Sequence, residues 1–114
     1  MIQIYHNPRC GKSRNCLLSL EQTGQEFEII KYLEENPNFE ELVSLIKKLN
    51  LKPIELVRVK EQIWTENFKG KTLTDEEIIQ AMVSNPILIE RPILIKGDKA
   101  IIGRDPEKVA DFLL

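Results

Sequence analysis

The chain has little of what defines several common protein classes. It contains two cysteines and one histidine, which are too few for a disulfide framework or for a set of ligands at metal-site spacing. No apolar run approaches the roughly 18 residues that a membrane-spanning helix needs. The 16 basic and 18 acidic side chains nearly balance, which gives no general case for nucleic acid or a membrane surface as partner. We therefore expect no metal site, no nucleic acid and no membrane.

The length and composition favour one globular domain over residues 1–114, because 42% hydrophobic content can form a core without covalent cross-links. The first residues lack the basic region and the long apolar stretch of a secretory signal. Without export, the two cysteines are expected to be reduced thiols in the cytoplasm. We expect a monomer.

The first forty residues predict a βαβ unit. Short apolar segments over 2–5 and 27–30 are typical of buried strands, and residues 11–22 between them predict a helix that ends before Gly24. A helix between two strands makes the strands parallel neighbours. The inward-facing residues of the helix are expected to be Leu17, Leu18 and Leu20.

The middle of the chain, about residues 36–84, predicts an inserted helical segment. Asn38 with Glu41, and Thr74 with Glu77, have the spacing of capping boxes ahead of apolar residues at helical intervals.

Between these two caps, Pro53 is expected to start a short apolar helix that carries Arg58 near its end. Residues 60–72 predict a polar helix and a loop, with Trp64 and Phe68 as the apolar anchors.

The last third of the chain predicts a hairpin and a helix. Residues 92–95 and 100–102 are typical of two antiparallel strands joined by a tight turn. Asp105 and Pro106 then have the positions of a cap and first turn of a C-terminal helix. The predicted fold class is α/β, in the order βαβ, helices, ββα.

Cys10 lies between the first predicted strand and the first predicted helix. A thiol at a helix N-terminus meets unpaired backbone N–H groups and the positive end of the helix dipole, which favour the reactive thiolate. Arg9, Lys12 and Arg14 add three cations, and Gly11 lets the backbone approach a ligand. The segment predicts a nucleophilic cysteine in an anion-attracting pocket.

Cys16 is predicted to be a packing residue instead. It lies six residues after Cys10, about 600° further around the helix, so a disulfide would require the helix to unwind. Other motifs are incomplete: the fourth position of a Cys-x-x-Cys pair is Ser13, and the first glycine of a Walker loop ending at Lys12 is replaced by His6.

His6 and three arginines complete the candidate site. A lone histidine is often structural, but His6 lies four residues before Cys10, where it could instead tune the thiol. Single arginines are usually solvated surface charges. Arg58, Arg91 and Arg104 nevertheless stand where apolar sequence ends, and guanidinium groups suit the capture of tetrahedral oxyanions.

A family resemblance runs through the whole chain in order. The residues that carry it are Tyr5-His6-Asn7-Pro8, Cys10-Gly11-x-Ser13-Arg14-Asn15, Tyr32-Leu33-Glu34, Leu56-Val57-Arg58, Asn85-Pro86-Ile87-Leu88-Ile89-x-Arg91-Pro92-Ile93 and Gly103-Arg104-Asp105-Pro106-Glu107. This set closely resembles the glutaredoxin-coupled arsenate reductases, the ArsC family. The resemblance implies a thioredoxin-like fold with an inserted helical segment, and a cis peptide bond before Pro92.

The same resemblance implies an activity. The cysteine at the Cys10 position attacks arsenate to form a covalent thiol–arsenate adduct. Glutathione, as thiol co-substrate, then attacks, arsenite is released, and the partner glutaredoxin removes the glutathione left on the protein. No bound cofactor is implied.

The residue roles that the resemblance implies follow the same pattern. The histidine at the His6 position tunes the cysteine, and the arginines bind the oxyanion together with the loop after Cys10. The implied oxyanion-binding residues are Gly11, Lys12, Ser13, Arg58, Arg91 and Arg104. Arg9, Lys12 and Cys16 depart from the smaller, uncharged residues of well-known members.

Two other functions remain open on the same scaffold. One is a glutathione-dependent thiol reductase. The other is an Spx-type redox regulator, which binds RNA polymerase through the carboxy-terminal domain of its α chain, often under the control of a Cys-x-x-Cys switch. Ser13 stands where that switch has its second cysteine.

Overall fold

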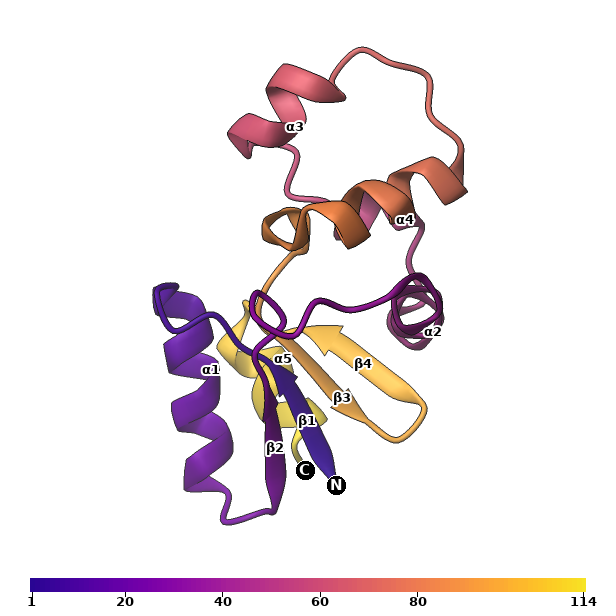
Figure 1. The fold of residues 1–114 in the computed structure, drawn as a ribbon. Helices are drawn as coiled ribbons and strands as arrows, with labels where there is room; N and C mark the ends of the chain where they lie inside the picture. The colour runs from indigo at the N-terminus through magenta and orange to yellow at the C-terminus, as the bar shows by residue number, and fades with distance from the viewer. The chain divides into compact units, whose positions relative to one another are not determined.

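A four-stranded mixed sheet forms the centre of the first of two units into which the chain divides (Figure 1). The structure is a computed structural model that describes all of residues 1–114. The first unit comprises Met1–Glu35 and Arg91–Leu114, and the second comprises Asn36–Glu90. The second unit includes the predicted helical insertion and extends it to Glu90.

The strands of the sheet run in the order β2-β1-β3-β4. β1 (Ile2–Tyr5) and β2 (Phe27–Ile30) are parallel, as the helix between them predicts. β3 (Ile93–Lys96) pairs antiparallel with both β1 and β4 (Lys99–Ile102). The hairpin is confirmed, although each of its strands reaches one residue further toward the turn than predicted.

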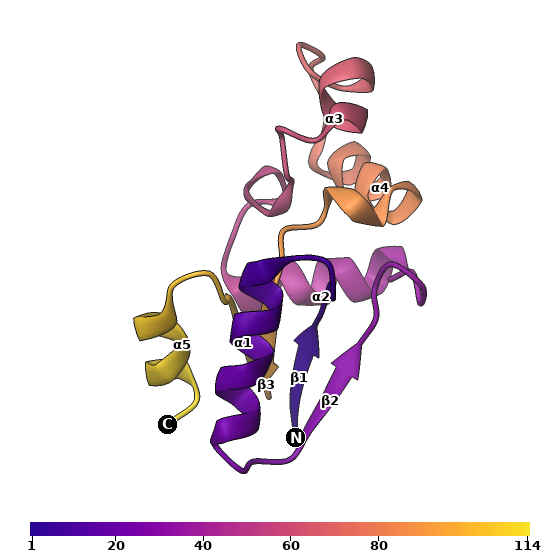
Figure 2. The ribbon, with the colours of Figure 1, turned by 90° about the vertical axis from the view of Figure 1, so that its left-hand side faces the viewer.

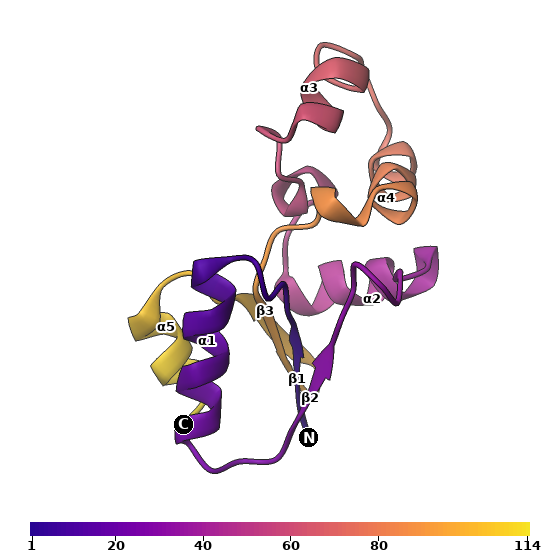
Figure 3. The ribbon, with the colours of Figure 1, turned by 60° about the vertical axis from the view of Figure 1, so that its left-hand side comes forward.

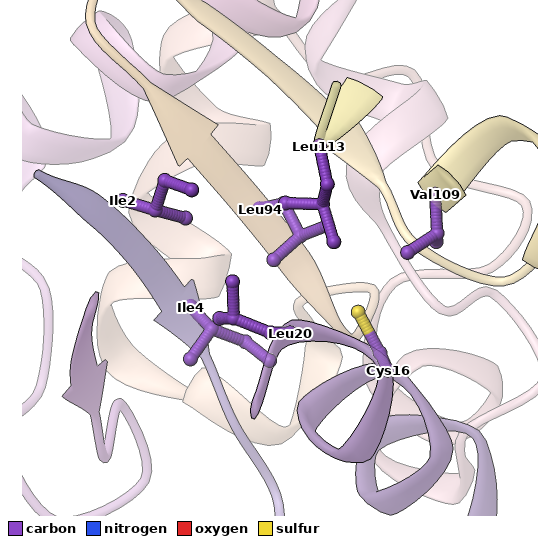
Figure 4. Packing of buried hydrophobic residues seen from close by; sticks show 7 residues of the cluster. All are labelled: Ile2, Ile4, Cys16, Leu20, Leu94, Val109 and Leu113. Atoms are coloured by element: carbon purple, nitrogen blue, oxygen red, sulfur yellow. The ribbon is translucent and has the colours of Figure 1, made fainter. Parts of the chain in front are cut away.

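Helices α1 (Gly11–Gln22) and α5 (Pro106–Phe112) lie side by side on one face of the sheet (Figures 2 and 3). The core between helices and sheet takes apolar side chains from both layers (Figure 4). Its buried members are Ile2, Ile4, Cys16, Leu20, Leu94, Val109 and Leu113.

One prediction about the inner face of α1 is wrong. Leu18 is 55% exposed, whereas Cys16 and Leu20 are buried and Leu17 packs at the edge of the core. Residues four apart share a helix face, and each single step turns the side chain by about 100°. The stripe that begins at Cys16 therefore takes Leu20 inward and turns Leu18 to the solvent.

Cys16 packs against Gly103, the residue that follows β4. The Gly103 N–H donates to the Pro92 carbonyl at 2.8 Å. A Cβ on Gly103 would lie 2.9 Å from Cys16 Sγ, 3.4 Å from Val109 Cγ2 and 3.5 Å from Pro92 Cγ. The sulfur thus occupies the space that a side chain at Gly103 would need, and burial confirms the packing position predicted for Cys16.

The second unit is helical. Its α-helices are α2 (Phe39–Leu49), α3 (Gln62–Asn67) and α4 (Asp75–Ser84), and its two 3₁₀ helices span Pro53–Leu56 and Pro86–Leu88. Both predicted capping boxes are present, at the starts of α2 and α4. Trp64 stacks on Phe68 with ring centroids 5.2 Å apart, which confirms these residues as anchors.

The helix predicted to carry Arg58 ends earlier than expected. It is a single 3₁₀ turn that stops at Leu56, and Val57 is extended and forms an antiparallel bridge with Ile89. The Arg58 N–H donates to the Leu88 carbonyl at 2.7 Å. A partner about 30 residues away in the sequence therefore overrides the local helical pattern.

The contact between Gly103 and Cys16 yields a stability prediction. Gly103→Ala should lower the free energy of unfolding by about 1–3 kcal/mol, because the added methyl overlaps the sulfur. Urea unfolding of the wild type, Gly103→Ala, Cys16→Ala and the double variant measures this. The double variant should lose about 1 kcal/mol less than the sum of the two single losses. Additive losses would contradict the proposed contact.

Candidate active site

Cys10 is the N-cap residue of α1, at the end of the loop that follows β1. The backbone fixes this position from both sides. The Cys10 N–H donates to the Asn7 carbonyl, and the Cys10 carbonyl accepts from the Arg14 N–H, both at 3.0 Å. The thiol is half-buried, so it is shielded from bulk water yet open to a reactant.

Asn7 and Arg14 shape the loop, and the sequence signals only the turn at Asn7. Asn7 Oδ1 accepts from the Arg9 N–H at 3.0 Å, and Arg14 Nη1 donates to the Pro8 carbonyl at 2.9 Å. An asparagine followed by proline is a common signal for such a side-chain-bonded turn. The Arg14 contact joins two residues whose proximity only the folded loop reveals.

The surroundings of Cys10 favour the thiolate. Burial, the largest single influence, raises its pKa, but the N–H of Ser13, the guanidinium of Arg91 and the N–H of Lys12 together outweigh burial and lower it. The thiol makes no capping hydrogen bond of full geometry. A thiolate accepts hydrogen bonds more strongly than a thiol does, so these donors act mainly on the ionised form.

Arg91 brings unused hydrogen-bonding capacity to the same place. It lies just before β3, and its peptide bond to Pro92 is cis, which confirms the prediction for Pro92. The Arg91 side chain interacts with Cys10. Its Nε and Nη1 atoms are buried and have no hydrogen-bond partner. A buried, unpaired guanidinium nitrogen is costly unless an anion satisfies it. These donors fit a bound oxyanion next to the thiol.

His6 and Ser13 form a buried pair behind the thiol. His6 Nδ1 lies 2.7 Å from Ser13 Oγ, and that hydroxyl oxygen also accepts from the Asn7 N–H at 3.0 Å. Burial, followed by the charge of Arg14, lowers the pKa of His6. We therefore assign a neutral imidazole whose Nδ1 accepts the Ser13 hydroxyl proton. Ser13 is fully buried, and its position orders the turn that presents Cys10.

Two further predicted loop residues border the thiol in different ways. Lys12 contributes its backbone N–H to Cys10, while the residue also lines a separate recess. A Cβ on Gly11 would meet only Arg14 Nη2, at the ordinary contact distance of 3.7 Å. No contact within the chain therefore requires glycine there.

The remaining two arginines lie in different surroundings. Arg104 is exposed and lines the same recess as Lys12. Arg58 belongs to the second unit, where its Nε lies 3.2 Å from Glu61 Oε1 and its Nη1 lies 3.5 Å from Glu90 Oε1. The structure thus brings Cys10, His6, Ser13 and Arg91 together within the first unit, and pairs Arg58 with two carboxylates in the second.

No group of three or more His, Cys, Asp or Glu side chains is arranged to hold a metal ion. No helix is both long and apolar enough to cross a membrane. The chemistry that the described residues offer is that of a thiolate nucleophile beside donors for an anion.

The fold and this site place the chain in a known class. It is an α/β protein with a thioredoxin-like fold, and an arsenate reductase of Vibrio cholerae has a similar structure. The TM-score with that protein is 0.91 at 42% sequence identity, and the match covers 96% of this chain and 95% of the other.

The sequence profile of the ArsC family matches residues 5–112. An uncharacterized protein of Escherichia coli K12 called YfgD is 45% identical over 98% of this chain and 96% of its own length. An arsenate reductase of Haemophilus influenzae is 41% identical over 96% of this chain and 97% of its own length. The chain belongs to the ArsC family.

The environment of Cys10 predicts how its reactivity depends on pH. In the wild type, alkylation by iodoacetamide should have its midpoint below the pH of an ordinary cysteine, because the α1 N–H groups and Arg91 stabilise the thiolate. Arg91→Gln removes a cation, so it should raise the Cys10 pKa and move the midpoint upward. Peptide mass spectrometry across a pH series measures the rate at each thiol.

Two internal comparisons make that experiment specific. Cys16 should stay unmodified in the folded protein, because burial raises its pKa to about 11. Arg9→Gln removes a neighbouring cation that is not among the groups acting on the thiol, so its midpoint should match the wild type. Equal upward shifts in both variants would show that general charge, rather than the Arg91 contact, lowers the pKa.

Proposed function

We propose that this protein is an arsenate reductase in which Cys10 is the nucleophile. The observation that carries the proposal is the pairing of a half-buried thiol of lowered pKa with two buried Arg91 nitrogens that lack a partner. Arsenate is a tetrahedral oxyanion, and its oxygens can accept from a planar guanidinium. Relatives that carry the name arsenate reductase support the choice of substrate.

The first step joins sulfur to arsenic. The Cys10 thiolate attacks the arsenic of hydrogen arsenate, one oxygen leaves as water after taking up a proton, and a Cys10 thiol–arsenate adduct forms. The Arg91 donors hold the oxyanion and balance its charge. The N–H groups of Lys12 and Ser13 supply the N-terminal donors of α1 that keep the sulfur ionised before the attack.

The second step transfers two electrons. The thiolate of glutathione attacks the Cys10 sulfur, the sulfur–arsenic bond breaks with its electron pair on arsenic, and arsenite leaves. The two sulfur atoms remain joined as a mixed disulfide between Cys10 and glutathione. Glutaredoxin then accepts the glutathione on its own thiolate and releases the Cys10 thiolate. The need for these thiols agrees with a reducing compartment such as the cytoplasm.

The supporting residues have separate tasks in this proposal. His6 and Ser13 are both neutral. They position the turn that holds Cys10 and contribute no charge to the binding of the substrate. Arg58 and Arg104 remain oxyanion-binding candidates, Arg104 from the first unit and Arg58 from the second. No bound cofactor takes part, because the reducing electrons come from glutathione.

The two other functions have less support from the site. A Cys-x-x-Cys switch would need a second thiol at position 13, where Ser13 is fully buried and hydrogen-bonded to His6 and to Asn7. This weakens the Spx-type regulator. A glutathione-dependent thiol reductase would use the same nucleophile, but it would leave the unpaired Arg91 nitrogens without a purpose.

The proposal predicts the behaviour of a coupled assay. With arsenate, glutathione, glutaredoxin and glutathione reductase, the wild type should consume NADPH in proportion to arsenate, and Cys10→Ser should fall to the background rate. A serine hydroxyl is not ionised near neutral pH, so it cannot replace the thiolate. Cys16→Ala is the matched control and should retain turnover within about twofold when the folded fraction is equal.

Two results would contradict this proposal. Arsenate-dependent turnover by Cys10→Ser would exclude Cys10 as the nucleophile. No arsenate-dependent turnover by a folded wild type, together with reduction of glutathionylated substrates, would favour the thiol reductase.

A further inference from the structure

A recess lies between one side of α1 and the chain that leads into α5. Its cavity volume is about 60 Å³, and it is partly open to solvent. Residues of α1 at helical spacing line one wall, and residues around the start of α5 line the other. The α1 wall consists of Lys12, Asn15, Cys16 and Ser19, and the other consists of Gly103, Arg104, Pro106 and Val109.

The lining of the recess is built for a negative group. It contains two cations, Lys12 and Arg104, and the polar side chains of Asn15 and Ser19, but no acidic residue. Asp105 is adjacent to Arg104 in the sequence, but its Oδ1 accepts from the Glu107 N–H as the cap of α5. Buried Cys16 and Val109 close the inner side of the recess with apolar surface.

Lys12 connects this recess with Cys10. Its backbone N–H acts on the Cys10 thiol, while its side chain is not among the groups that change the Cys10 pKa. The same residue therefore faces two neighbouring sites with different atoms. An anion paired with the Lys12 side chain would lie at the first turn of α1, which follows directly after the N-cap residue Cys10.

We propose that this recess binds a carboxylate of the glutathione that reacts at Cys10. The inference rests on the proposed function, because it names the site of the co-substrate in that reaction. The carboxylate pairs with the Lys12 side chain and accepts from Asn15 and Ser19. Glutathione bound in this way presents its thiolate toward the Cys10 sulfur, where attack forms the mixed disulfide.

The dimensions agree with this assignment. Asn15 lies five residues after Cys10, so it is about 7.5 Å further along the axis of α1 and about 140° around it, whereas Lys12 is about 3 Å further along. Glutathione is a tripeptide with its thiol on the central residue. In an extended chain the glycine carboxylate lies about 5 Å from the Cα of that residue, and the carboxylate of the γ-linked glutamate lies further away. One end of the peptide can thus occupy the part of the recess beside Lys12 while the thiol reaches Cys10 at the N-terminus of α1.

The test uses a reaction that needs no arsenate. Oxidised glutathione reacts with the Cys10 thiolate to give the Cys10–glutathione disulfide and one glutathione thiolate. Bis(2-hydroxyethyl) disulfide reacts in the same way but carries no carboxylate. Stopped-time intact-mass measurements give both rates for the wild type, Lys12→Gln, Ser19→Leu and Arg9→Gln, after circular dichroism confirms equal folding.

We expect a selective loss of rate. Lys12→Gln should slow the reaction with oxidised glutathione about tenfold, the effect of one charge-assisted hydrogen bond, and should slow the reaction with the neutral disulfide far less. Ser19→Leu fills the recess without changing charge and should show the same selectivity. Arg9→Gln removes an exposed cation outside the recess and should affect the two disulfides nearly equally.

Three outcomes would overturn the inference. In the first, Lys12→Gln and Ser19→Leu react with oxidised glutathione as fast as the wild type. In the second, these variants react more slowly with both disulfides to the same extent. In the third, Arg9→Gln loses rate with oxidised glutathione as selectively as Lys12→Gln does. The last would indicate diffuse attraction of a negative reactant. Each can occur while the wild type still reduces arsenate, so failure of the recess is distinguishable from failure of the arsenate reductase proposal.

Discussion

The guanidinium of Arg91 is held beside the Cys10 thiol with two of its nitrogens buried and unpaired. A cation in that position stabilises a thiolate when the site is empty and an oxyanion when a substrate arrives. The N-terminus of α1 contributes in the same direction through the N–H groups of Lys12 and Ser13. Much of the first unit can be understood as the framework that keeps these donors and this sulfur together.

That framework joins segments from the two ends of the chain. β1 leads into the Cys10 loop, and β3, its antiparallel neighbour, begins two residues after Arg91. The Gly103 N–H donates a hydrogen bond to the Pro92 carbonyl. Because Gly103 has no side chain, the Cys16 side chain of α1 packs closely against it. Cys16 thus serves the packing of the first unit, and burial raises the pKa of its own thiol.

Local patterns in the sequence predict those features that depend on neighbouring residues. The four strands, both capping boxes and the N-cap position of Cys10 follow from short-range rules, and the structure has all of them. The prediction for Leu18 is wrong because several adjacent leucines fit more than one helical stripe. The end of the Arg58 helix differs from the prediction because Val57 pairs with Ile89, a partner that no local pattern identifies.

The sequence predicts the residue types of the candidate active site but not all of their contacts. Cys10 and the arginines can be selected by residue type and position, but the unpaired nitrogens of Arg91 depend on how β3 lies beside β1. The contacts of Asn7 and Arg14 and the shared lining of the recess also arise only on folding. Long-range pairing decides which of several plausible charges face the thiol.

The central claim is that Cys10 itself passes through a covalent cycle driven by arsenate. Intact and peptide mass spectrometry of the protein incubated with arsenate and glutathione, but without glutaredoxin, tests this most directly. We expect a single glutathione to accumulate on Cys10 only when arsenate is present, with Cys16 unmodified. Absence of this adduct, its formation at the same rate without arsenate, or its location on Cys16 would contradict the mechanism.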